Sequence, residues 1–172
     1  MTADVGRAGD DVDQVIAAWH RERPDLDLSP LAVLSRVSRL ARRLDLARDR
    51  AFAAHELAVW EFDVLAALRR TGPPYRLSPG QLLAATLVTS GTMTNRVDRL
   101  EERGLVVREP VPDDRRATWV RLTEAGRRRV DAAFTDLLAE ERDLLAALDP
   151  AAHTEVAAAL RHLLLQFESP TA

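Results

Sequence analysis

The stretch that decides the fold is Asp114-Arg115-Arg116-Ala117-Thr118-Trp119-Val120-Arg121-Leu122-Thr123. A proline-containing turn precedes it, and from Trp119 onward aromatic or polar residues alternate with aliphatic ones. This period of two predicts a strand that turns Trp119 and Arg121 to one face and Val120 and Leu122 to the other. Thr123 then begins a helix. We therefore expect a hairpin with a basic tip, a shape that fits a nucleic-acid groove because phosphates attract guanidinium groups.

Two short helices are predicted before this hairpin. Ser78-Pro79 reads as a helix cap followed by proline at the first helical position, and the helix continues to about Ala84. After a break at residues 86–89, Ser90 is expected to cap a second helix that ends near Gly104. Helix, turn, helix and two-stranded wing make a winged helix-turn-helix, whose second helix normally enters the major groove.

The faces of the second helix suggest a division of labour. The side that should contact the core carries Met93, Val97 and Leu100. The candidate DNA-binding residues are Ser90, Thr92, Asn95 and Arg99 on this helix and Asp114, Arg115 and Arg116 at the wing. Asparagine suits adenine and arginine suits guanine or phosphate, although a polar helix face is also compatible with simple solvation.

Each wing residue has its own expected part. We expect Arg116 to enter the minor groove and Arg115 to contact a phosphate. Asp114 is an anion, so its expected part is to orient an arginine through a charge-assisted hydrogen bond, to form the turn, or both.

The run from Leu77 to Gly126 resembles the MarR (multiple antibiotic resistance regulator) family of transcription factors. The resemblance is carried by Ser90-Gly91-Thr92-Met93-Thr94-Asn95-Arg96, by Leu100-Glu101-Glu102-Arg103-Gly104-Leu105-Val106, and by Asp114-x-Arg116 followed by Leu122-Thr123. It implies a mainly α fold with a small β-wing, a dimeric winged helix-turn-helix with an extra N-terminal helix, and a regulator that binds double-stranded DNA at a palindromic operator.

Within that family the chain is similar to the urate-responsive subgroup, which has an N-terminal helix bearing a tryptophan. The resemblance implies a ligand site formed by Trp19, Asp63, Arg96 and Arg108. A flat aromatic anion between an indole and guanidinium groups is physically reasonable. The chain is also similar to trans-aconitate-responsive regulators, so tricarboxylates such as citrate remain an alternative ligand class.

The residues themselves leave simpler interpretations open for three of these positions. Trp19 falls on the stripe Val12, Val15, Ile16 and Trp19, whose spacing predicts a core position. Asp63 interrupts an apolar segment and either has a partner or is exposed. Arg96 lies at the border of the buried stripe, from which it can turn toward the crevice between the two lobes or pair with Glu102.

The rest of the chain predicts helices for dimerisation. Residues 11–55 and 124–168 are assigned to a helical dimerisation part and residues 57–123 to the DNA-binding lobe, all within one domain spanning 1–172. The last helix carries an apolar stripe formed by Val156, Leu160, Leu163, Leu164 and Phe167. Such a stripe needs a cover, and we expect a second copy of the chain to provide it.

Composition excludes several functions. The chain has 172 residues, 47% of them hydrophobic, a net charge of −3 and no cysteine, which excludes disulfides and zinc–cysteine sites. The four histidines lack metal-ligand spacing, and neither a phosphate-binding glycine loop nor a nucleophile motif is present. We expect no enzyme activity, no cofactor, no metal, no membrane span and a cytoplasmic location. The rival from another class is a ligand-binding or interaction module that does not bind DNA.

Overall fold

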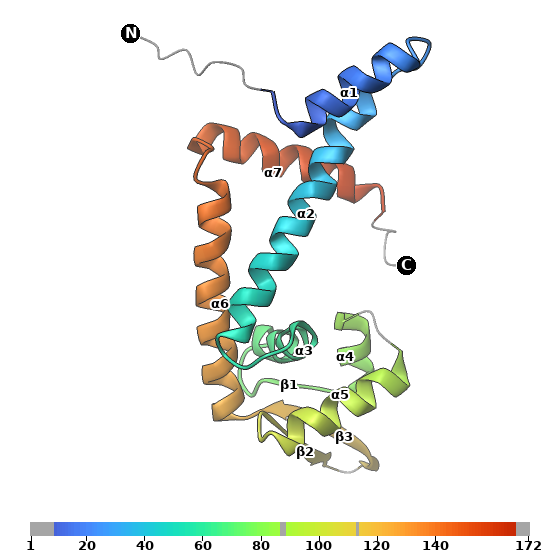
Figure 1. Cartoon of the computed structure of the whole chain (residues 1–172). Helices are drawn as coiled ribbons and strands as arrows, with labels where there is room; N and C mark the ends of the chain where they lie inside the picture. The colour runs from blue at the N-terminus through green and yellow to red at the C-terminus, as the bar shows by residue number, and fades with distance from the viewer. Residues whose placement is uncertain (1–8, 87–88, 113, 168–172) are drawn as a thin grey trace. The chain divides into compact units, whose positions relative to one another are not determined.

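The computed structural model describes residues 9–86, 89–112 and 114–167, with the side chains of residues 114–116 left undescribed. These residues are mostly helical, with one small three-stranded sheet (Figure 1). They divide into two compact units, one ending at Leu46 and the other beginning at Ala47. The predicted class, mainly α with a small β-wing, is confirmed, and each unit is described by itself below.

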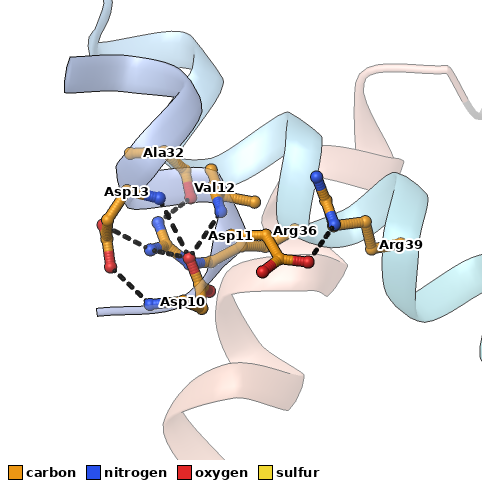
Figure 2. A network of polar contacts seen from close by, with 7 residues as sticks. All are labelled: Asp10, Asp11, Val12, Asp13, Ala32, Arg36 and Arg39. Atoms are coloured by element: carbon orange, nitrogen blue, oxygen red, sulfur yellow. Dashed lines mark hydrogen bonds and ion pairs between the residues drawn. The ribbon is translucent and has the colours of Figure 1, made fainter. Parts of the chain in front are cut away.

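The first unit contains α1 (Asp11–Glu22) and the larger part of α2 (Ser29–Ala53). Asp10 caps α1, because its side chain accepts hydrogen bonds from the backbone N–H groups of Val12 and Asp13. The same carboxylate accepts from the Nε of Arg36 on α2 at 2.8 Å, and Asp11 accepts from Arg39 at 3.1 Å (Figure 2). One cluster of charges therefore begins α1 and fastens it to α2.

The second unit holds the end of α2 and the remaining elements. These are α3 (Val59–Arg70), β1 (Arg76–Leu77), α4 (Pro79–Thr86), α5 (Ser90–Glu102), β2 (Val106–Val111), β3 (Asp114–Leu122), α6 (Glu124–Leu145) and α7 (Pro150–Leu165). The predicted order of helix, helix, hairpin and helix is confirmed. Helix α4 begins as predicted, since the backbone N–H of Gln81 donates to Ser78 and the Gln81 side chain accepts from the backbone N–H of Ser78.

The sheet has the order β1-β3-β2 and is antiparallel throughout. Val120 and Leu122 of β3 are 1% and 2% exposed, so the predicted alternation of faces is confirmed. A register shift between Pro110 and Val111 breaks the pairing close to the turn. Strand β1 was not predicted from the sequence, because two residues are too short to display a period.

The core of the second unit is formed by the end of α2, by α3, α4, α5 and α6, and by the sheet. Its largest fully buried side chains include Phe52, Leu65, Leu68, Leu82, Met93 and Leu100. Helix α6 begins against the base of the hairpin, where Thr123 accepts from the backbone N–H of Gly126 at 3.0 Å and donates to the carbonyl oxygen of Gly104 at 2.8 Å. The loop that follows α5 and the base of the hairpin are therefore held to the start of α6 by direct hydrogen bonds.

Helix α7 differs from the other helices of this unit because it contains no buried residue. Its cap is Asp149, whose side chain accepts from the backbone N–H of Ala152 at 2.8 Å, and Pro150 is the first helical residue. The apolar stripe along this helix is between 38% and 61% exposed in the single chain, and Phe167, just past the end of the helix, is 77% exposed. The stripe therefore remains uncovered when the chain is considered alone.

Candidate nucleic-acid interface

Helix α5 is the element that would read DNA, and its buried side fixes it to the core. Met93, Val97 and Leu100 are at most 2% exposed, as predicted. Thr92 and Asn95, on the other side, are exposed. One detail of the prediction is wrong: the cap position is Thr89, and Ser90 is the first residue inside the helix. The Thr89 hydroxyl lies 2.9 Å from that of Thr92.

One flank of α5 is a row of arginines that faces the start of α3. Arg96 and Arg99 place their guanidinium carbons 5.5 Å and 5.3 Å from the ring centre of Trp60. Arg103 continues the row and donates to the buried carboxylate of Glu61 at 2.5 Å. Arg96 thus contacts an indole rather than Glu102, the partner that its sequence position also allowed. We call Arg96, Arg99 and Arg103 the arginine flank.

The opposite flank of α5 is acidic and faces the wing. Asp98 and Glu101 both accept hydrogen bonds from the guanidinium of Arg108 on β2, and Glu101 also accepts from the Arg108 backbone N–H at 2.8 Å. Partial burial of the guanidinium acts to lower the pKa of Arg108, but the two carboxylates outweigh it and the pKa is raised. We call Asp98 and Glu101 the acidic flank; through Arg108 it ties α5 to the hairpin.

Side-chain contacts near its base hold together the two strands of the wing, β2 and β3. Arg121 donates to Glu109 across the two strands at 2.6 Å, and the guanidinium carbon of Arg76 lies 5.2 Å from the ring centre of Trp119. The side chains of Asp114, Arg115 and Arg116 lie outside the described residues. Their expected contacts with DNA and with one another therefore stay predictions.

Asp63, one of the four predicted ligand residues, has a partner that the sequence did not reveal. It accepts from Arg48 at the end of α2 at 2.8 Å, and both side chains are partly exposed. The Nε of Arg48 is buried and has no hydrogen-bond partner among the described residues. Asp63 therefore has a partner and is also partly exposed, so both of the alternatives that the sequence left open hold in part. Fifteen positions separate it from Arg48, and no periodicity in the sequence joins the two residues.

The other ligand residues are in different surroundings. Trp19 is 51% exposed on α1 in the first unit, so the core position that its spacing predicted is wrong for the single chain. Arg96 contacts α3, whereas Arg108 contacts the acidic flank of α5. Within the described residues, no hydrogen bond or ion pair joins Asp63, Arg96 and Arg108. The four-residue site therefore stays a prediction.

Two other searches of the described part of the chain bear on function. No group of three or more histidine and acidic side chains there is arranged to hold a metal ion. None of the helices there combines the length and the apolar character needed to cross a bilayer.

Comparison with known proteins agrees with the geometry of the lobe. A family model described as the MarR family matches residues 55–117. The transcriptional regulator PecS of Dickeya dadantii is 37% identical over 150 residues, which cover 87% of this chain and 90% of PecS.

Two solved structures are similar as well. Sco5413 of Streptomyces coelicolor, a MarR family transcriptional regulator, is 27% identical with a TM-score of 0.65, covering 81% of this chain and 96% of its own. BpsR of Bordetella bronchiseptica, whose DNA binding is regulated by 6-hydroxynicotinic acid, is 27% identical with a TM-score of 0.57, covering 74% and 98%.

The relatives are transcriptional regulators, in agreement with the expectation that the chain is not an enzyme. Identity of this extent over most of the length, together with the wing and the fastened second helix, shows that the chain belongs to the MarR family of DNA-binding transcriptional regulators.

Proposed function

We propose that the protein is a homodimeric repressor that binds a near-palindromic operator and is released from it by a small anionic metabolite. The observation that carries the DNA-binding part is the way α5 is held. One side is buried and both flanks are fastened, so the remaining polar face, with Thr92 and Asn95, is free to meet base edges.

The proposed contacts follow from the chemistry of each side chain. Asn95 matches the hydrogen-bonding edge of adenine in the major groove. We expect Ser90, Thr92 and Arg99 to contact phosphates or base edges from the same helix. At the wing, Arg116 enters the minor groove, Arg115 contacts a phosphate, and Asp114 orients them.

The proposed dimer rests on the uncovered stripe of α7. Leu164 near the end of α7 and Phe167 just past it are 61% and 77% exposed, and leaving such large apolar side chains in water is unfavourable. A second copy covers the stripe in a two-fold assembly and places two copies of α5 on successive half-sites, whose centres are about 10 base pairs apart.

The proposed ligand is a flat aromatic anion such as urate, bound by Trp19, Asp63, Arg96 and Arg108. BpsR, which is regulated by an aromatic acid, supports this ligand class. An anion on Arg108 competes with Asp98 and Glu101 for the same guanidinium. Binding therefore loosens the tie between α5 and the wing and weakens DNA binding, and by linkage DNA weakens the ligand by the same factor.

The test is a titration of the DNA complex with urate and, separately, with citrate. The DNA is a labelled duplex from upstream of the protein's own gene, and the titration is repeated on Arg108→Ala and Trp19→Phe. Urate should release the parent, and both variants should need more of it. If neither compound weakens DNA binding, or if Arg108→Ala responds like the parent, the ligand part of the proposal is wrong.

A further inference from the structure

The indole of Trp60 stands under two of the three arginines in the arginine flank. Arg96 and Arg99 are about one helical turn apart on α5, and both guanidinium carbons lie within 5.5 Å of the same ring centre. Trp60 is partly buried against the core through its position at the start of α3. The ring is therefore a fixed platform, whereas the two arginines are long and adaptable.

The two arginines differ from the third in how they are held. Arg103 has the Glu61 carboxylate and the Glu56 carbonyl oxygen, two directional acceptors. Among the described residues, neither Arg96 nor Arg99 has a carboxylate oxygen within 4.0 Å. The two guanidinium groups repel each other, and without an attractive contact they would move apart into solvent. The face of the indole supplies that contact and therefore orients both side chains.

We propose that Trp60 is a positioning residue for DNA recognition: it does not touch DNA, but it holds Arg96 and Arg99 and so fixes the orientation of α5. The inference rests on the proposed DNA-binding function and extends it. Because one ring serves both arginines, a change at Arg96 alters the support of Arg99, which lies nearer the exposed face. Through these two arginines, Trp60 couples the side of α5 that faces α3 to the side proposed to contact DNA.

The test compares Trp60→Leu, which removes the aromatic face, with Trp60→Phe, which keeps one. Affinity is measured by fluorescence anisotropy for the upstream duplex and for a scrambled duplex of equal length and composition. A lost cation–aromatic support should lower the ratio of specific to non-specific affinity about fivefold to tenfold in Trp60→Leu. Trp60→Phe should keep most of the ratio, and the salt dependence should not change because no cation is lost.

A matched control is Tyr75→Leu, since Arg69, at the opposite end of α3 from Trp60, lies 5.1 Å from the Tyr75 ring centre. This variant loses the same kind of contact and should keep the parent's affinity ratio. The combined variant Trp60→Leu with Arg99→Gln should lose less than the sum of the two single losses, because Trp60 acts partly through Arg99. If Trp60→Leu does not fold, Trp60→Met takes its place.

Several outcomes overturn the inference. One is a leucine or methionine variant that melts earlier but keeps the parent's affinity ratio, which is the behaviour of a residue with only a structural role. Another is a strictly additive effect in the Arg99→Gln background. If the parent itself does not distinguish the two duplexes, the proposed function fails, and this inference fails with it.

Discussion

Arginine serves four different purposes in the second unit, and its neighbours decide which. Arg103 pairs with a buried carboxylate, Arg108 bridges two carboxylates of the acidic flank, and Arg48 holds Asp63. Arg96 lies over an indole instead. A planar guanidinium suits all four settings because it donates in several directions and also stacks. Some of the arginines near the exposed polar face of α5 therefore position this helix through contacts within the protein.

At the wing and on α5, two substitutions should fail in different ways. Arg116→Ala should weaken binding to all duplexes and reduce the slope of log affinity against log salt by about one, because a cation near the phosphates is lost. Asn95→Ala should keep that slope and relax sequence preference, with about 1–3 kcal/mol of discrimination lost. Anisotropy titrations at several salt concentrations separate the two, and an Arg116→Ala variant that binds like the parent contradicts the role assigned to the wing.

At the scale of helices and strands, the sequence predicted where the elements lie, but not which distant residues contact the flanks of α5. The Met93, Val97 and Leu100 stripe and the helix start at Ser78-Pro79 are local patterns, and the structure has both. The platform under Arg96 and Arg99 comes from Trp60, more than thirty positions earlier. Periodicity tells which side of a helix is polar, but not which distant residue meets that side.

The close contact between α6 and the hairpin base leaves no room for a side chain at Gly126. A Cβ atom there would lie 2.1 Å from the backbone oxygen of Leu105, which cannot rotate away. Gly126→Ala should therefore lower the free energy of unfolding by about 1–3 kcal/mol. Gly91 on α5 has nothing within 4 Å of its would-be Cβ, so Gly91→Ala should raise it by about 0.5–1 kcal/mol. Urea denaturation measures both, and equal effects would refute the close approach.

The joint between α1 and α2 should depend on pH. The hydrogen bond from Arg36 lowers the pKa of Asp10 from its ordinary value, so folding favours the ionised carboxylate. Its contribution is present above the ordinary aspartate pKa and is lost as the pH falls toward the lower folded value. Asp10→Asn keeps a good capping residue but loses the ion pair, so it should weaken the docking of α1 on α2, although the pairs of Arg36 with Asp13 and of Arg39 with Asp11 remain. A helix this short is marginal on its own, so weaker docking should let its amides exchange faster.

Hydrogen exchange of α1 amides, followed from neutral to acidic pH, tests this joint. The parent should lose protection on acidification, and Asp10→Asn should show reduced protection with a weaker pH dependence. Asp25→Asn is the control, because among the residues that the structure describes Asp25 pairs with Arg23 alone, two positions away, and so links no two helices. Identical exchange profiles in the parent and Asp10→Asn would show that the cluster does not hold α1.

At the scale of the whole molecule, the apolar surface of α7 requires a partner. We expect sedimentation velocity to find a dimer at micromolar concentration, because the stripe ending in Leu164 and Phe167 is too exposed for a single chain. Leu164→Glu should shift the equilibrium toward monomer, since a charge would be buried at the interface. Gln166→Glu, on the same helix but off the stripe, is the control. A parent that sediments as a monomer at this concentration contradicts the assembly.

Recognition of an operator by two copies of α5 is tested most directly by a hydroxyl-radical footprint on the DNA upstream of the protein's own gene. Two fastened recognition helices in a two-fold dimer should protect two short segments with centres about 10 base pairs apart, on half-sites related by inverted symmetry. Diffuse protection along the whole duplex, or none at protein concentrations well above the dimer dissociation constant, would contradict it.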